Sequence, residues 1–393
     1  LAAAEQLQDR LDITLLLTGD PDVVPPRTAT FPIRKGRISA ASGHLGAFDL
    51  AIDALAAPLP SSRARLRFGA PRDGARSKAD IVIDLSGDLP LFPGDGLRDG
   101  YLRADPDDPV AVQRVLFKAA EFVGTFDKPR YIDFHADLCA HSRSRIVGCR
   151  RCLDLCPAGA ISPAGDTVAI DPQICGGCGA CAAACPTGAA SYAVPSVDVL
   201  LRRLRALLAT YRAAGGTDPV VLFHDGDHGA ALLDALARFG DGLPARVLPV
   251  ALNETGQLGL EAIAAAFAYG ASAVQVLTRA KPKHDIAGLR DTLATADVLL
   301  SALGYGHGRA RTIETDDPDA LTTALATVTI EPPSGPSPRA SSNFLPLGGK
   351  RDVLKLALRE LHRVAPRPVA TVPLPKGAVF GRVAVATDGC TLC

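Results

Sequence analysis

Eight cysteines between residues 139 and 185 are the side chains in this sequence best suited to chemistry. They are Cys139, Cys149, Cys152, Cys156, Cys175, Cys178, Cys181 and Cys185, most of them separated by two or three residues. Such short gaps let one loop present several thiolates to one centre, and thiolates bind iron–sulfur clusters and structural zinc. A disulfide framework is the alternative, but such frameworks are typical of small secreted domains and this chain has 393 residues. We therefore predict metal binding in a reducing compartment.

The cysteine region is an internal duplication. The segment YIDFHADLC, which ends at Cys139, aligns with TVAIDPQIC, which ends at Cys175. The segments CRRCLDLCPAGAIS and CGACAAACPTGAAS, which begin at Cys149 and Cys178, align in the same way. Both halves carry the pattern C-x2-C-x3-C-P, but nine residues follow Cys139 where only two follow Cys175. The first half is thus a stretched copy of the second, and Cys139 takes the place of the first ligand.

This duplicated run resembles that of the bacterial dicluster 4Fe-4S ferredoxins. The resemblance implies that the fourth cysteine of each half binds the cluster of the other half. It therefore implies two ligand sets, Cys139, Cys149, Cys152 and Cys185 for cluster I, and Cys175, Cys178, Cys181 and Cys156 for cluster II. We expect Gly176, Gly177 and Gly179 to let the backbone approach a cluster and point N–H groups at its sulfurs.

Alternatives accompany this assignment. Zinc also binds C-x2-C pairs, although two quartets that each end in Cys-Pro favour iron–sulfur clusters. If Cys139 does not reach cluster I, a three-iron cluster or a ligand such as His141 would take its place. The final CTLC, Cys390 to Cys393, is interpreted as a truncated third motif, because GRVAVATDGC repeats the strand-then-cysteine lead-in. A surface thiol pair or half a zinc knuckle is the alternative interpretation of Cys390 and Cys393.

Charge is distributed unevenly around the two halves. Four arginines lie in the first motif, namely Arg143, Arg145, Arg150 and Arg151. In the second half, no charged residue lies between Asp171 and Asp198. Because a nearby cation stabilises the negative charge gained on reduction, we expect cluster I to have the higher reduction potential. In the alternative interpretation, the arginines form a solvated docking face.

The residues before the cysteines predict an α/β region. Apolar runs at 12–17 and 79–85 are suited to buried strands, and the alternation with glycines over 31–53 predicts a hairpin. Asp108 followed by Pro109 predicts the start of a helix, by the rule of a cap followed by proline.

The residues after the cysteines predict a small parallel sheet. An amphipathic helix is expected over 196–214. Strands are then expected at 220–223, 245–250, 272–277 and 310–315, and helices at 230–239, 258–269 and 289–303. Repeated βα units with helices of this length imply a parallel sheet that is covered on both faces.

The predicted fold class is α/β with several domains. A bacterial dicluster ferredoxin-like α+β domain would be inserted between an N-terminal α/β region and a small parallel-sheet βα domain. The predicted segments are the N-terminal region at 1–127, the dicluster domain at 128–193, the βα domain at 194–330, a Pro/Ser-rich linker at 331–343, and a helix with the truncated motif at 344–393.

The βα domain carries a second resemblance. Its segment GLEAIAAAFAYGASAVQVL, residues 259–277, resembles the delta subunit of methyl-viologen-reducing hydrogenase, in which this domain bears an iron–sulfur cluster and links hydrogenase to heterodisulfide reductase. The domain has no cysteine in this chain, so the resemblance implies a scaffold or docking role. HDGDH, from His224 to His228, follows the first strand, at the edge where open α/β sheets bind ligands. These side chains either bind a metal or are solvated loop residues.

The composition excludes several classes of function. With 42 basic and 42 acidic residues the formal net charge is zero, so no general field would attract nucleic acid or an anionic membrane. The longest uncharged runs do not suit a membrane span, so we expect a cytoplasmic protein without nucleic-acid or membrane partners. The chain has no Met, even at position 1, which we interpret as a segment of a longer product.

The predicted function is single-electron transfer through two 4Fe-4S clusters, with further clusters expected beyond Cys393. By family resemblance, the chain would be a carrier subunit or module of a formate dehydrogenase, hydrogenase or heterodisulfide reductase system. Its partners would be redox proteins of those complexes, such as a dehydrogenase, hydrogenase or reductase subunit. The alternatives are a reductase whose active site lies outside this segment, and a redox-sensing or regulatory module. Two adjacent clusters argue against a sensor, since one cluster suffices for sensing.

Overall fold

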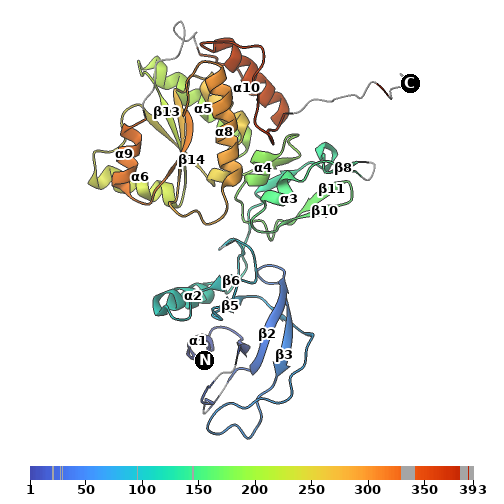
Figure 1. Ribbon diagram of the computed structural model, residues 1–393. Helices are drawn as coiled ribbons and strands as arrows, with labels where there is room; N and C mark the ends of the chain where they lie inside the picture. The colour runs from blue at the N-terminus through green and yellow to red at the C-terminus, as the bar shows by residue number, and fades with distance from the viewer. Residues whose placement is uncertain are drawn as a thin grey trace. The chain divides into compact units, whose positions relative to one another are not determined.

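The computed structural model divides into two compact units (Figure 1). It describes residues 1–19, 22–26, 28, 30–94, 96–143, 146–328, 341–380 and 388. Unit 1 consists of Leu1–Lys128, Pro157–Ala160 and Asp171–Gly176, and unit 2 of Pro129–Cys156, Ile161–Ile170 and Gly177–Cys393. The cysteine region therefore contributes segments to both units. The finer domain boundaries that the sequence suggests remain predictions.

Unit 1 is built on a four-stranded sheet in the order β1-β2-β3-β4. The strands are β1 (Leu15–Leu17), β2 (Ile33–Ser42), β3 (Phe48–Ala56) and β4 (Ala75–Ala79). β2 and β3 are antiparallel and form the predicted hairpin, whereas β1 pairs with β2 in parallel. A second small sheet joins β5 (Val82–Asp84) to β6 (Tyr101–Arg103). Phe48, Leu50 and Ile52 alternate along β3 and pack with Val82 and Phe92 in the core of this unit.

Unit 1 also contains α1 (Ala2–Leu7) and α2 (Pro109–Glu121). α2 begins where the sequence predicts it. The carboxylate of Asp108 accepts hydrogen bonds from the amides of Val110 and Ala111, and Pro109 occupies the first helical position. Both features favour a helix start, because the cap satisfies amides that have no partner within the helix.

Unit 2 contains the predicted parallel sheet, with the strand order β14-β13-β15-β16. Its strands are β13 (Val220–Asp225), β14 (Val247–Leu252), β15 (Ala273–Thr278) and β16 (Ala310–Glu314). The helices around it are α5 (Val197–Ala213), α6 (His228–Phe239), α7 (Leu260–Ala268), α8 (Ala287–Ala302), α9 (Pro318–Ala326) and α10 (Lys350–Val364), and the short helix η2 (Thr255–Gln257) follows β14. Of these helices, α9 was not predicted from the sequence.

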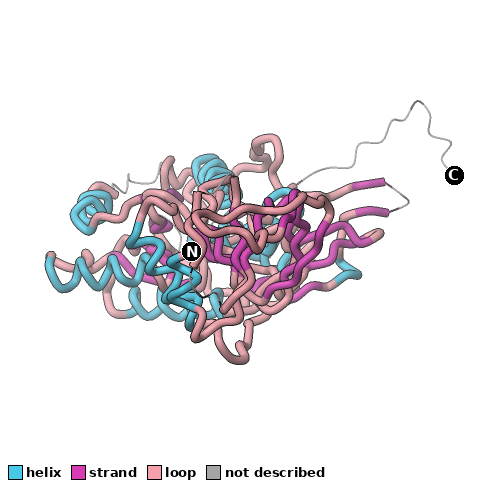
Figure 2. Tube along the Cα trace, turned by 90° about the horizontal axis from the view of Figure 1, so that it is seen from below, coloured by secondary structure: helices cyan, strands magenta, loops and turns pink. Residues whose placement is uncertain are grey.

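The helices cover both faces of this sheet, as Figure 1 shows. Val221 and Phe223 of β13 pack with α5, α7, α8 and α10, whereas Val220 and Leu222 pack with α6 and α9. This alternation follows from the two-residue period of a strand. Helices and strands both occur throughout the chain (Figure 2), in agreement with the predicted α/β class.

The rest of unit 2 is the cysteine region. It contains two antiparallel ribbons, one of β7 (Ile132–Phe134) with β12 (Ala190–Tyr192), the other of β10 (Ile161–Ala164) with β11 (Thr167–Ile170). Two short helices, α3 (Arg151–Leu155) and α4 (Ala180–Ala184), carry parts of the cysteine motifs. A small hairpin joins β8 (Ser142–Arg143) to β9 (Ile146–Val147), after the short helix η1 (Ala136–Leu138). Within the described ranges, no helix is long and apolar enough to cross a membrane.

Candidate metal centre

The strand pairing of the cysteine region reproduces the duplication seen in the sequence. β7, which leads to Cys139, pairs with β12, which follows Cys185. β11, which leads to Cys175, pairs with β10, which follows Cys156. Each lead-in strand therefore pairs with the strand that follows the last cysteine of the other half. This exchange is the arrangement in which the last cysteine of each half can reach the other half's centre.

The two short helices are related in the same way. A shift of 29 residues carries α3 onto α4, and the same shift aligns Cys149 with Cys178. The helices pack against each other. Cys156 ends α3 and Cys185 ends α4, each with an extended backbone conformation. The last cysteine of each half thus leaves its helix with similar geometry.

Three of the cysteines predicted for cluster I lie close enough to the fourth, Cys152, to affect its pKa. Burial, together with the charges of Cys149, Cys185 and Cys139, raises the pKa of Cys152 to about 11. Such coupling between charges weakens with distance. Cys139 from beyond the stretched spacer and Cys185 from the other half are therefore both near Cys152. That the four bind one cluster remains a prediction.

The spacer after Cys139 folds back on itself. The carbonyl oxygen of His141 accepts hydrogen bonds from the amides of Gly148 (2.7 Å) and Cys149 (3.2 Å), across the small hairpin of β8 and β9. The buried ring of His141 places its Nδ1 2.9 Å from the carbonyl oxygen of Cys149. The described residues of the spacer therefore return the chain to the first motif. His141, the alternative ligand, is hydrogen-bonded to the backbone of that motif.

Cys185 has a polar environment. The amide of Ala190 donates to its Sγ at 3.5 Å, and Oγ1 of Thr187 lies 3.6 Å from the same sulfur. Burial acts to raise the pKa of this thiol, but these groups, the amide of Thr187 and the Lys350 ammonium together lower it. Donors of this kind stabilise a thiolate and tune a cluster that it binds. Lys350, which belongs to α10, was not predicted as part of the site.

The cysteines predicted for cluster II are divided between the units. Cys175 belongs to unit 1, where its amide donates to the carbonyl oxygen of Asp171 at 3.0 Å. Cys178, Cys181 and Cys156 belong to unit 2, and Cys181 is buried. The binding of these four to one cluster remains a prediction.

Two glycines of the second motif are required by the backbone conformation and by packing, in addition to the predicted approach of the backbone to a cluster. Gly177 and Gly179 have φ angles of +74° and +79°, which side chains of L-residues rarely allow. A Cβ atom on Gly177 would lie 2.8 Å from the ring of Tyr131, and one on Gly179 would lie 2.5 Å from Cβ of Gln257. Packing from outside the motif thus requires glycine at both positions.

The donor set consists of thiols, which are the usual ligands of iron–sulfur clusters. All eight cysteines are thiols and none is in a disulfide. Across the described ranges, no group of three or more His, Cys, Asp or Glu side chains could hold a single metal ion. Four thiolates on one zinc ion would lie only about 3.8 Å apart, given a Zn–S distance of about 2.3 Å. A four-iron cube binds each thiolate at a different iron corner, so its four thiolates lie farther apart than those on one zinc ion.

The comparisons with known proteins agree with this assignment. Residues 145–189 match the family model of the 4Fe-4S dicluster domain. The match includes seven of the eight cysteines and leaves Cys139 outside. It confirms a ferredoxin-type iron–sulfur domain and supports an electron-transfer role. The comparisons with curated proteins and with solved structures gave no match, so the resemblance to the hydrogenase delta subunit remains a prediction.

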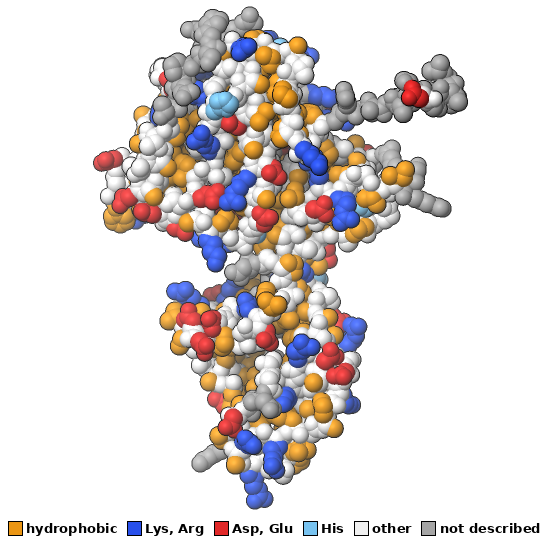
Figure 3. Space-filling model, in the orientation of Figure 1, with side chains coloured by type: hydrophobic (Ala, Val, Ile, Leu, Met, Phe, Trp, Pro, Cys, Tyr) orange, Lys and Arg blue, Asp and Glu red, His pale blue; other side chains and the backbone are white. Residues whose placement is uncertain are grey.

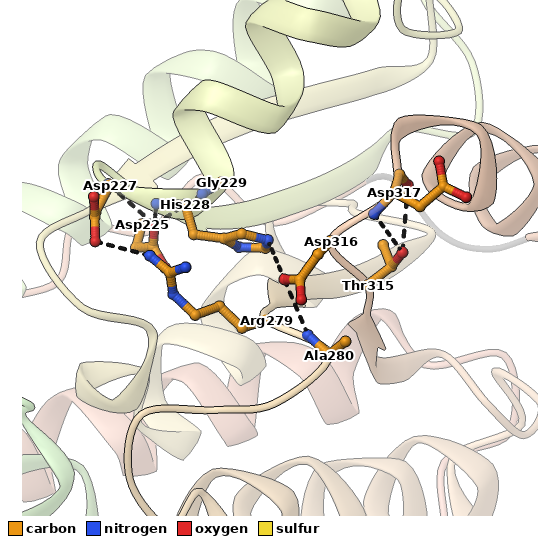
Figure 4. A network of polar contacts seen from close by, with 9 residues as sticks. All are labelled: Asp225, Asp227, His228, Gly229, Arg279, Ala280, Thr315, Asp316 and Asp317. Carbon is orange, nitrogen blue, oxygen red and sulfur yellow. Dashed lines mark hydrogen bonds and ion pairs between the residues drawn. The ribbon is translucent and has the colours of Figure 1, made fainter. Parts of the chain in front are cut away.

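The interpretation of HDGDH as solvated loop residues is wrong for its two histidines. His224 lies on β13 and His228 begins α6, and both are buried. Nε2 of His228 lies 3.0 Å from a carboxylate oxygen of Asp316 (Figure 4). The carboxylate of Asp225 accepts hydrogen bonds from the amides of Asp227, His228 and Gly229, and so caps α6. The segment is part of the packed edge of the sheet, and this explains the burial.

Two of the four arginines of the first motif, Arg150 and Arg151, have described side chains. Arg150 is exposed and forms an ion pair of 3.4 Å with Asp154, and Arg151 donates to the carbonyl oxygens of Gly377 and Ala378. Three predicted features lie outside what the structure describes, namely the side chains of Arg143 and Arg145, Cys390 and Cys393, and most of the linker. Arg150 and Arg151 therefore each have a partner other than a cysteine.

Proposed function

We propose that this chain passes single electrons through two 4Fe-4S clusters, as a carrier module of a larger oxidoreductase complex. The proposal is carried by the match of residues 145–189 to the 4Fe-4S dicluster domain, together with the proximity of Cys185, the last cysteine of the second half, to Cys152 of the first half. That proximity is expected if the halves exchange their last ligands, as in a two-cluster domain. The reciprocal pairing of the four strands supports the same exchange.

In this proposal the cysteines bind the clusters, and other residues donate hydrogen bonds to the thiolates or exclude water. Cys139, Cys149, Cys152 and Cys185 would hold cluster I, and Cys175, Cys178, Cys181 and Cys156 would hold cluster II. When bound, 4Fe-4S clusters accept and release single electrons. The amide of Ala190 donates to Cys185, and buried Ala182, Ala189 and Tyr192 exclude water on that side. Water exclusion and N–H donors are two means by which a protein sets a cluster potential.

The βα domain acts as the support of the cysteine region in this proposal. The hydroxyl of Tyr192 donates to the carbonyl oxygen of Gly177 at 2.6 Å and accepts from the side-chain amide of Asn253 at 2.7 Å. Burial raises the pKa of Tyr192, so its phenol stays protonated. A Cβ atom on Gly256 would lie 2.5 Å from the carbonyl oxygen of Cys178. The loop after β14 therefore packs directly on the second motif.

This packing occupies the edge at which open α/β sheets bind ligands, beyond the carboxyl ends of the strands. A scaffold role for the domain follows, and it agrees with the absence of cysteine from 194–330. Acidic and basic side chains are interspersed over the visible face of each unit (Figure 3), so we expect partner recognition by shape and local contacts more than by a net field. A hydrogenase, formate dehydrogenase or heterodisulfide reductase system is the proposed setting.

Iron and sulfide analysis of the anaerobically purified chain tests the proposal. Two clusters require about eight iron and eight sulfide per chain. Reduction with dithionite should give EPR signals of two interacting centres that disappear on reoxidation. Stoichiometric zinc, or signals that do not return after a cycle of reduction and oxidation, would contradict electron transfer. About four iron per chain would contradict the second cluster alone.

A further inference from the structure

A buried lysine reaches the cysteine region from the far end of the chain. Lys350, the first residue of α10, donates through Nζ to the carbonyl oxygens of Ala182 and Ala183, the latter at 2.7 Å. The same Nζ lies 3.7 Å from a carboxylate oxygen of Glu261. These side chains are only 9% and 2% exposed. Two carbonyl oxygens thus accept hydrogen bonds from the ammonium group, and the carboxylate lies at ion-pair distance.

Two glycines make room for this pair. A Cβ atom on Gly188, whose φ is +79°, would lie 2.9 Å from Cβ of Lys350. A Cβ atom on Gly259 would lie 2.4 Å from both carboxylate oxygens of Glu261. Glycine at positions 188 and 259 therefore leaves space for the side chains of Lys350 and Glu261, and a residue with a Cβ atom at either position would collide with them.

Local preferences do not explain the position of Lys350. A cation at the first position of a helix is unfavourable, because the amides there carry partial positive charge. Burial of an ammonium group adds a further cost unless partners compensate it. Its partners are the last carbonyls of α4, the helix that ends at Cys185. The hydrogen bonds to α4 therefore explain the position of Lys350, whereas its place at the start of α10 does not.

We propose that Lys350 is a positioning residue that raises the reduction potential of the cluster bound by Cys185, and that Glu261 moderates this effect. This inference rests on the proposed electron-transfer function. A positive charge near a thiolate ligand stabilises the additional negative charge of the reduced state. The arginines of the first motif are expected to raise the potential of cluster I, and Lys350 would add a buried positive charge with the same effect.

A redox titration followed by EPR tests the proposal on the anaerobically purified chain. In Lys350→Met, the potential of one cluster should fall while the iron content stays unchanged. Lys355→Met is the matched control, because it removes the same charge from an exposed position of the same helix, and it should leave both potentials unchanged. Glu261→Gln should raise the potential that Lys350→Met lowers. Loss of packing alone would not shift the reduction potential in opposite directions in Lys350→Met and Glu261→Gln.

The outcomes separate the two proposals. An absence of iron–sulfur signals from the unchanged chain would remove the electron-transfer function itself. Full iron content with an unchanged potential in Lys350→Met would overturn the role of Lys350 and leave electron transfer standing. If Lys350→Met does not assemble its clusters, Glu261→Gln decides: a raised potential supports the role of Lys350, and an unchanged or lowered one overturns it.

Discussion

At the scale of single residues, thiols in one region have opposite electrostatic environments. Cys152 is surrounded by other thiols, and burial with their charges raises its pKa. Cys185, against the effect of burial, has donors and a cation that lower its pKa. Ionisation of Cys152 is thus disfavoured without metal, and a bound cluster would favour its thiolate because the iron carries positive charge.

The metal-free chain should lose stability at high pH. The pKa of Cys152 is about 11 in the folded chain against 9.0 for an ordinary thiol, so the folded state holds its proton longer. Because the unfolded state releases that proton first, the free energy of unfolding should decrease as the pH rises from about 9 to about 11. Urea unfolding of the iron-free chain across this range measures the effect. In Cys152→Ser the decrease should be smaller, and an equal decrease in both proteins would contradict the assignment.

The lysine and the histidines show the limit of prediction at this scale. Spacing and duplication identify the eight cysteines, because their ligand pattern is local in sequence. Lys350 lies 165 residues beyond Cys185 in the sequence, and no local pattern connects the two. The burial of His224 and His228 likewise depends on loops from other strands. Contacts that depend on tertiary packing were the ones that sequence patterns did not reveal.

At the scale of elements, the parallel sheet is predictable because its strands are apolar runs between helices. The predicted strand at 245–250 is observed as β14, Val247–Leu252, a shift of two residues. α9 was missed, although Asp317 and Pro318 carry the same start signal as Asp108 and Pro109. The exchange of strands between the two halves could not be read from apolar patterns. The resemblance to dicluster ferredoxins implied an exchange of cysteine ligands, but no strand pairing was predicted.

Gly179 offers a test of how the second motif is held against η2. Gly179→Ala should lower the stability of unit 2 by about 2 kcal/mol or more, because alanine disfavours its positive φ and collides with Gln257. Gly226→Ala is the control, since a Cβ atom there has open space, and it should change stability by less than about 0.5 kcal/mol. Denaturant unfolding under anaerobic conditions gives both values. Equal effects of the two substitutions would contradict the packing argument.

At the scale of the whole molecule, the chain combines a cysteine region with a sheet that contains no cysteine. The loop after β14 packs on the second motif, and α10 supplies a cation to the end of α4. The loop after β14 and α10 would therefore set the position and the potential of a cluster without binding one. This accounts for a parallel sheet whose ligand-binding edge is occupied by the chain itself.

The central claim is that each half of the cysteine region supplies its last thiolate to the other half's cluster. A crystal structure of the anaerobically purified protein, with iron located by anomalous scattering, tests it most directly. The account predicts Sγ of Cys185 on the same iron–sulfur cube as Cys152, and Sγ of Cys156 on the cube of Cys178 and Cys181. Cys185 bound instead to the cube of Cys178 and Cys181 would contradict it.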